Sequence, residues 1–129
     1  MRKGILSDQR GFSLLEMLLV VSIVGVLAAV AVPRFNNAIM MANTARVQSD
    51  LQVLNSAIVL YQAEKGAFPT KLSELENYVQ DVNNLKPPKG MCSLRKESAI
   101  DVSGIDYAIT DGEATCKGKK LSEFGRKEE

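Results

Sequence analysis

The chain has 129 residues and a net charge of +1, from 16 basic and 15 acidic side chains, so charge gives no strong argument for a nucleic-acid partner. It contains no histidine, which excludes histidine acid–base catalysis, histidine metal sites and Ser-His or Cys-His pairs. The length allows one small domain, and much of the apolar content lies near the N-terminus, so the remainder can bury only a small core.

Residues 1–11 are polar and basic and precede a long apolar run. Only Arg34 follows closely after that run, so the positive-inside rule places the N-terminus in the cytoplasm. A secretory signal peptide cleaved near Ala29-Val30-Ala31 is the alternative. Two features argue against it: the carboxylate of Glu16 inside the run and a helical pattern that continues beyond the supposed cleavage site.

Residues 12–33 are predicted to form a transmembrane helix, because a helix from Phe12 to Val32 is about 31 Å long and a bilayer core is about 30 Å thick. One carboxylate, Glu16, lies inside this run, and a charge there costs about 2.5–3.5 kcal/mol on insertion scales. Glu16 either pairs with a partner or closes a capping box with Ser13, and composition does not separate these two roles.

Residues 34–65 are predicted to continue the same helix in amphipathic form, giving a rod about 80 Å long. Apolar side chains recur on one stripe of this half: Val47, Leu51, Leu54, Ile58 and Tyr61. Lys65 favours the C-terminal end of the helix and Gly66 its left-handed cap. Pro33 and Gly25 are expected to loosen the rod, although both residues are also ordinary in membrane helices.

Residues 66–116 are predicted to form a small globular head. Thr70 is expected to be the N-cap of a short helix through Val79, with Leu72, Leu75 and either Tyr78 or Val79 on its buried side. The alternation from Ile105 to Thr110, followed by Asp111-Gly112, predicts a β-hairpin with a type I′ turn.

In that hairpin Ile109 faces Ala114 and Tyr107 faces Cys116. Ala99 to Val102 are a candidate third strand, and the antiparallel sheet is expected to cover the helix stripe.

Cys92 and Cys116 allow only one intramolecular pairing, and such a bridge would contribute about 3 kcal/mol to the stability of a small domain. We predict this disulfide, which requires an oxidising location; two buried free thiols are the alternative. Residues 117–129 are rich in charge and are predicted to be a solvated tail, with contact to DNA or an anionic surface as a minority interpretation.

The stretch Arg10-Gly11-Phe12-Ser13-Leu14-Leu15-Glu16 resembles the prepilin-peptidase signal of type IV pilins and type II secretion pseudopilins. The match is strong over residues 8–66, only architectural over 67–116 and absent beyond. It implies an α+β, type IV pilin-like fold. In that fold a long N-terminal helix, half transmembrane and half amphipathic, packs on a small antiparallel β-sheet head.

The resemblance also implies roles for individual residues. Gly11 would end a leader of residues 1–11 that a prepilin peptidase removes, and Phe12 would become the N-methylated end. Glu16 would attract the Phe12 ammonium of a neighbouring subunit during assembly, since a lone carboxylate in a helix bundle is costly. Gly25 and Pro33 would mark the two ends of a segment that loosens when subunits pack.

The function implied is that of a structural subunit of a type IV pilus-like filament, not an enzyme. A major pseudopilin of a type II secretion or competence (DNA-uptake) system is the alternative, and a minor pilin at the filament tip is a third class. Expected partners are copies of the chain, related minor pilins, the peptidase, an inner-membrane assembly platform and the membrane. The precursor would lie in the inner membrane and the product in a cell-surface or periplasmic filament.

No cofactor is expected, with calcium as the one alternative. Major pseudopilins bind calcium in a C-terminal loop, and four carboxylates are available here: Asp101, Asp106, Asp111 and Glu113. The hairpin register explains the first three more simply as strand and turn residues.

Overall fold

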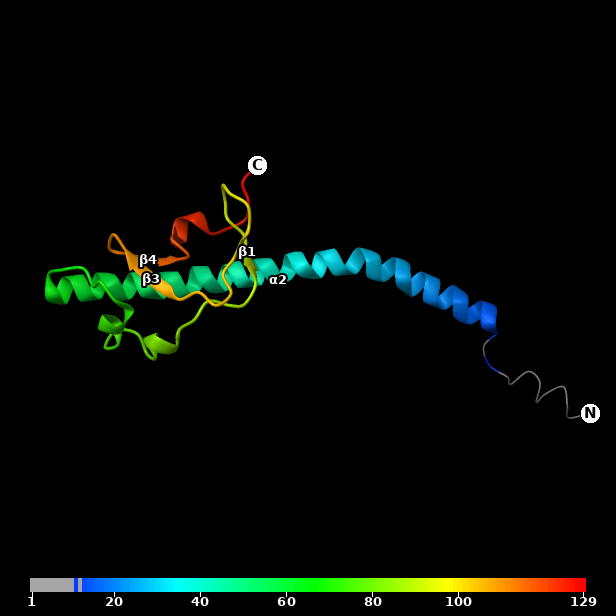
Figure 1. The fold of residues 1–129 in the computed structure, drawn as a ribbon, viewed down its shortest axis with the longest axis horizontal. Coiled ribbons are helices and arrows are strands. Elements are labelled where there is room, and N and C mark those ends of the chain that lie inside the picture. The colour runs from blue at the N-terminus through cyan, green and yellow to red at the C-terminus, as the bar shows by residue number, and fades with distance from the viewer. Residues whose placement is uncertain (1–10, 12) are drawn as a thin grey trace, which may run out of the picture. The chain divides into compact units, whose positions relative to one another are not determined.

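The computed structural model describes Gly11 and residues 13–129. Over these residues the chain divides into two compact units, the first ending at Asn36 and the second comprising Asn37–Glu129. Helix α2 (Leu14–Lys65) contributes to both units, and the remaining elements belong to the second (Figure 1). They are η1 (Leu72–Leu75), η2 (Val82–Asn84), β1 (Met91–Cys92), β2 (Ile100–Asp101), β3 (Tyr107–Thr110), β4 (Glu113–Cys116), β5 (Lys119–Lys120) and η3 (Leu121–Glu123).

The predicted long helix is confirmed from Leu14 to Lys65, and it continues through Pro33. Its predicted first residue, Phe12, lies outside the described residues. The helix ends as its sequence predicts, because Gly66 takes a φ of 74° and donates its N–H to the Gln62 carbonyl at 2.8 Å. A residue without a Cβ adopts this left-handed cap at little cost.

In the first unit, α2 exposes its apolar side chains on all faces. Leu14 is 88% exposed and Leu18 is 64% exposed, and an 18-residue window of the helix is apolar enough to cross a membrane with none of it buried. Because soluble chains seldom expose so large an apolar surface, this half of the helix requires lipid or other protein around it.

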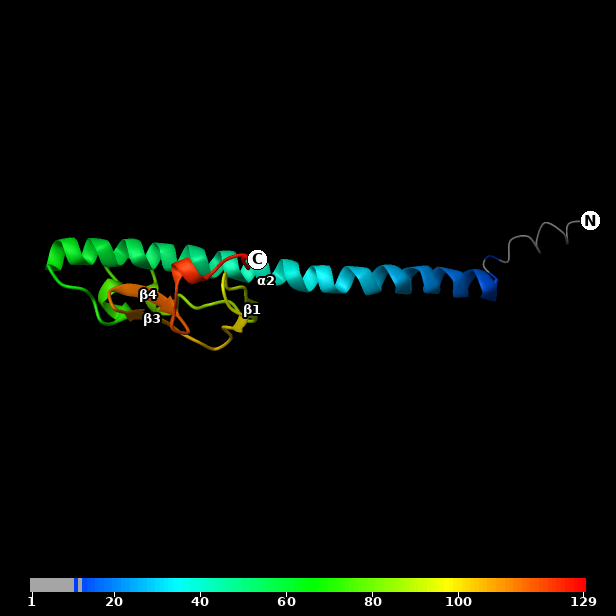
Figure 2. The same ribbon diagram turned by 90° about the horizontal axis from the view of Figure 1, so that it is seen from above.

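In the second unit, α2 buries the predicted stripe. Val47, Leu51 and Leu54 are fully buried and Ile58 is 1% exposed, while Tyr61 packs against this core from its edge. Figure 2 shows the strands lying on one side of this half of the helix. Burying four aliphatic side chains of this kind contributes roughly 1.5–3 kcal/mol each, which makes the stripe the principal attachment of the head.

The strands form two small antiparallel sheets, β1-β2 and β3-β4-β5. The predicted hairpin is confirmed in its register, with Tyr107 opposite Cys116 and Ile109 opposite Ala114. Its turn residues Asp111 and Gly112 have φ values of 52° and 77°, as a type I′ turn requires.

The candidate third strand at 99–102 does not join that hairpin. Residues Ile100–Asp101 form β2, which pairs with β1 in the other sheet, with Cys92 opposite Ile100. The third strand beside the hairpin is β5, where Cys116 lies opposite Lys119.

The prediction that residues 117–129 form a solvated tail is wrong for the first part of that segment. A second tight turn, with positive φ at Lys117 (52°) and Gly118 (75°), reverses the chain from β4 into β5. Phe124 then inserts into the core and is fully buried, and it pairs with Leu94 in an isolated β-bridge. The globular head therefore extends well past Cys116.

The predicted short helix is also corrected. Only Leu72–Leu75 are helical, in 3-10 form, and the Thr70 hydroxyl is not the cap. Instead a Glu74 carboxylate oxygen accepts the backbone N–H groups of Thr70 (2.6 Å) and Lys71 (2.9 Å). These bonds favour the charged form and hold the pKa of Glu74 below its ordinary value. Of the side chains predicted to be buried, Leu75 is fully buried and Val79 is 8% exposed, whereas Leu72 and Tyr78 are only partly buried.

Candidate filament-assembly site

The predicted processing and assembly residues lie where α2 begins. Gly11 has a left-handed backbone with φ 70°, and a Cβ added there would meet nothing within 4 Å. Phe12, the predicted mature N-terminus, lies outside the described residues. Three residues before the helix begins, the chain therefore carries a glycine in a backbone conformation that costs other residues energy.

Ser13 and Glu16 form one half of the predicted capping box. The Ser13 hydroxyl accepts the Glu16 backbone N–H at 3.2 Å, and the Ser13 carbonyl accepts the N–H of Met17 at 3.1 Å. The Glu16 side chain is exposed, and its carboxylate makes no hydrogen bond or ion pair with any other residue in the described part of the chain. The Glu16 backbone thus takes part in the helix cap, whereas its carboxylate is not used by any residue that the structure describes.

The two residues predicted to loosen the helix lie on its exposed half. A Cβ added to Gly25 would meet nothing within 4 Å, and Pro33 lies inside the continuous helix. Ser22 satisfies its hydroxyl by donating to the Leu18 carbonyl at 2.8 Å. Their predicted role in loosening the helix stays a prediction.

Polar side chains of α2 hold the head in register, and sequence reasoning missed them. The Thr44 hydroxyl accepts the buried Ser93 N–H at 2.8 Å, and Gln48 donates to the Phe124 carbonyl at 2.9 Å. These side chains pair with backbone groups of the head, and the Phe124 carbonyl accepts a second bond from Arg95 Nε at 3.2 Å.

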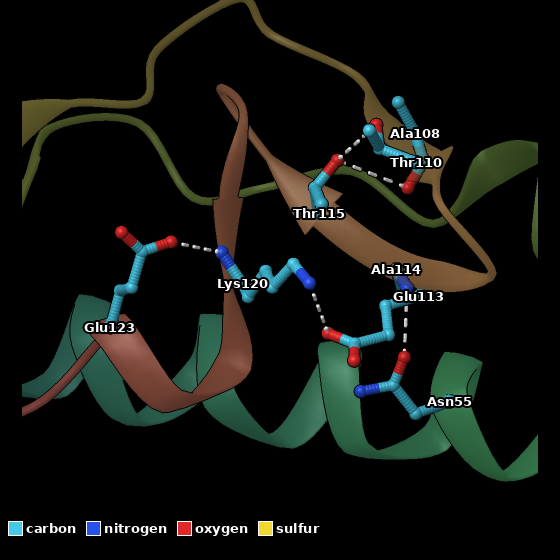
Figure 3. A network of polar contacts seen from close by, with 8 residues as sticks. All are labelled: Asn55, Ala108, Thr110, Glu113, Ala114, Thr115, Lys120 and Glu123. Atoms are coloured by element: carbon cyan, nitrogen blue, oxygen red, sulfur yellow. Dashed lines mark hydrogen bonds and ion pairs between the residues drawn. The ribbon is translucent and has the colours of Figure 1, made fainter.

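Asn55 makes the same kind of contact with the hairpin. Its carbonyl oxygen accepts the Ala114 N–H at 2.8 Å, and in Figure 3 it points from the helix to the edge of β4. Beside it, Lys120 pairs with Glu113 at 3.3 Å, so β5 is tied across the neighbouring strand. Asn55 adjoins the apolar stripe at Leu54 and Ile58, and a polar residue at the border of a buried stripe is the signal that could have indicated it.

One part-buried hydrogen bond, from a hydroxyl to a carboxylate, joins the sheet to the helix. Tyr107 is 3% exposed and donates its O–H to Asp50 at 2.6 Å. Burial, followed by the bond to the Asp50 carboxylate, raises the pKa of Tyr107 well above its ordinary value. Tyr107 therefore stays neutral and acts as a donor.

Cys92 and Cys116 are both fully buried and present as free thiols. Burial raises the pKa of Cys116 to about 11, with the neighbouring Cys92 adding to the effect, and burial likewise raises the pKa of Cys92. High pKa values in an apolar setting make neither sulfur a reactive nucleophile. The disulfide between them stays a prediction.

The four carboxylates considered for calcium have separate partners. Asp101 accepts the Ser103 N–H at 2.9 Å, Asp106 pairs with Lys86, Glu113 pairs with Lys120, and Asp111 occupies the hairpin turn. Over the described residues, no group of three or more potential metal-ligating side chains comes together.

Comparisons with known proteins agree with this architecture. Residues 6–32 match the motif described as the prokaryotic N-terminal methylation motif. The chain is 36% identical over 108 residues to type II secretion system core protein G of Escherichia coli (strain K12), covering 80% of this chain and 72% of that protein.

Fimbrial proteins are also similar to the chain, at somewhat lower identity. Fimbrial protein Q of Moraxella bovis is 30% identical over 107 residues, covering 83% of this chain and 67% of that protein. A fimbrial protein of Dichelobacter nodosus is 34% identical over 117 residues, covering 88% and 73%. No solved structure matches the chain.

A long apolar N-terminal helix that carries small antiparallel sheets at its other end defines the α+β pilin class of fold. With the methylation motif and these relatives, the chain belongs to the family of type IV pilins and type II secretion pseudopilins.

Proposed function

We propose that the chain is a structural subunit of a type IV pilus-like filament, cut between Gly11 and Phe12 and assembled through α2. The observation that supports this most directly is the exposed apolar half of α2, whose first turn carries a carboxylate with no partner among the described residues. Residues 1–11 are the leader, 12–33 the membrane and filament-core helix, and 34–65 its amphipathic continuation. The head carries no catalytic role.

The assembly step that we propose joins two copies of the chain. After cleavage the Phe12 ammonium of an incoming subunit pairs with Glu16 of its neighbour. An unpaired carboxylate in a low-dielectric helix bundle is costly, so the register that supplies an ammonium is favoured over slipped registers. Gly25 and Pro33 let the helix loosen as it packs.

The expected partners and location follow from this role. They are copies of the chain, related minor pilins, the prepilin peptidase and an inner-membrane assembly platform. The precursor lies in the inner membrane with its N-terminus in the cytoplasm, and the filament reaches the periplasm or cell surface. Export to an oxidising compartment would allow Cys92 and Cys116 to form their disulfide.

A major pseudopilin of a type II secretion or DNA-uptake system is the second candidate, and the 36% identity to core protein G favours it. Electron microscopy of the cell surface separates the two. Long extracellular fibres that contain the chain support the pilus, whereas short periplasmic filaments support the pseudopilus.

Glu16→Gln tests the proposed assembly step. Gln can replace Glu in a capping box but cannot attract an ammonium. We expect membrane insertion and cleavage at wild-type levels and a loss of filaments in sheared fractions. Ser13→Ala is the matched control, because it removes the cap hydroxyl and keeps the carboxylate, and it should retain filaments. Filaments at wild-type abundance in Glu16→Gln would rule out amine pairing.

A further inference from the structure

Two cations near the C-terminus, Arg126 and Lys127, line an open hollow of about 410 Å³ in the second unit. Its other lining residues come from the start of this unit's helix and from the segment after β1: Asn37, Met40, Met41 and Ser93. Both cations are exposed, and the methionines give the hollow an apolar wall. Positive charge above apolar side chains is the composition that suits a phospholipid headgroup and the carbons next to it.

The backbone that carries the two cations is held in place. Before them, Phe124 is fully buried and the Gly125 N–H donates to the Ser93 carbonyl at 3.1 Å. After them, the Glu128 N–H donates to the Arg95 carbonyl at 2.9 Å. Arg126 and Lys127 therefore project from an ordered edge of the head.

The surrounding acids leave these cations free. Glu128 pairs with Arg95 at 3.5 Å, and Glu97 pairs with Lys119 at 2.7 Å. Among the described residues, no carboxylate lies within ion-pair distance of Arg126 or Lys127. Glu129 follows closely in the chain and lowers the net positive charge of this segment, but it forms no ion pair with either cation. The two cations are thus available to an external anion.

The position of the hollow along the chain identifies that anion. Asn37 follows Val32, the last residue of the apolar run, by five residues of continuous helix, a rise of about 8 Å. Bilayer headgroups occupy the first several ångströms beyond the hydrocarbon core. Asn37 therefore lies close along the chain to the segment proposed to span the membrane, and long cationic side chains that line the same hollow can extend toward phosphate.

We propose that Arg126 and Lys127 bind the phosphate groups of anionic phospholipids in the leaflet next to the head. This surface rests on the proposed function only in requiring that α2 spans the membrane. It holds the head of the stored subunit against the bilayer, and the contacts are given up when the subunit leaves the membrane for a filament.

Native mass spectrometry of the full-length chain in a non-ionic detergent tests this surface. The chain is titrated with dioleoyl-phosphatidylglycerol, with phosphatidylcholine of the same acyl chains, or with inorganic phosphate. At about fivefold per cation, Arg126→Gln/Lys127→Gln should weaken phosphatidylglycerol binding roughly 25-fold. Arg126→Lys/Lys127→Arg should retain it. The matched control Lys65→Gln/Lys71→Gln removes two exposed cations at the far end of the head and should bind as wild type.

Three results would overturn the proposal: equal binding of the two lipids, unchanged binding by the double Gln variant with its circular dichroism intact, or inorganic phosphate displacing phosphatidylglycerol at equal concentration. The last result would indicate an anion site without preference for lipid. The proposed function is tested by two other measurements: the presence of filaments in sheared fractions and the extraction of the chain from membranes. Neither measurement depends on the lipid titration, so the two proposals can fail independently.

Discussion

Replacing Phe124 by Ala tests whether the charged C-terminal segment is part of the head. Phe124 is fully buried against the core, and a Phe-to-Ala change at such a site costs about 3–5 kcal/mol. A unit of this size has a free energy of unfolding of about 5–15 kcal/mol, so the loss is a large fraction of the total. Amide hydrogen exchange of the full-length chain in detergent measures this loss of stability. In Phe124→Ala, the protection of β3 and β4 from exchange should be at least about a hundredfold lower than in the wild type.

Phe68→Ala is the matched control, because the Phe68 side chain is 52% exposed. Half-burial of this ring is worth roughly 1 kcal/mol, so protection of the same strands should fall only severalfold. If residues 117–129 were a solvated tail, Phe124→Ala would cost less than about 0.5 kcal/mol. Equal protection in Phe124→Ala and the wild type would refute the placement of this segment in the core.

Two further predictions concern the head. The exported chain should contain a Cys92–Cys116 bridge and should therefore be lighter than its thiol form by two hydrogen atoms. Reductant should lower the free energy of unfolding by about 3 kcal/mol, and EDTA should not change it. A fall in stability with EDTA but not with reductant would instead favour a calcium-binding pseudopilin. Burial and the Asp50 carboxylate raise the pKa of Tyr107, and a carboxylate partner raises that of Tyr78 to about 12. Both tyrosines have a higher pKa in the folded chain than the value of about 10 in the unfolded chain. Their hydrogen bonds therefore contribute their full stabilisation below pH 10, and this contribution is lost as pH rises through the folded-state pKa values. Tyr107→Phe should flatten the alkaline fall in melting temperature, and an unchanged slope would contradict the assignment.

Periodicity and turn chemistry predicted the parts of the fold that depend on local rules. The stripe from Val47 to Ile58 follows from helical spacing, and the Tyr107–Cys116 register follows from a two-residue turn with positive φ at both positions. The helix end at Gly66 is equally local. Each of these signals lies within a few residues of the feature that it determines.

The parts that sequence reasoning missed depend on distant neighbours. Phe124 is one aromatic residue in a charged segment, so the average composition of the segment predicted that it would be exposed to solvent. One buried aromatic ring is nevertheless enough to anchor the segment in the core. Lys117-Gly118 was an overlooked turn signal between β4 and β5. The bonds of Gln48 and Asn55 to head carbonyl and amide groups could not be predicted, because they depend on which backbone groups the sheets leave unpaired.

The candidate assembly site was predicted from its motif. The structure adds that the backbone and the carboxylate of Glu16 are used differently. The Glu16 backbone N–H takes part in the cap with Ser13, whereas its carboxylate makes no contact with another described residue. Capping and pairing are therefore compatible, and different variants test them.

The mass of the chain recovered from purified filaments tests the central claim most directly. The account predicts a mature chain that begins at Phe12, carries one N-methyl group and is a principal component of the filaments. A chain that retains residues 1–11, a chain that begins near Val32 as a signal-peptide product would, or filaments that lack the chain would contradict it.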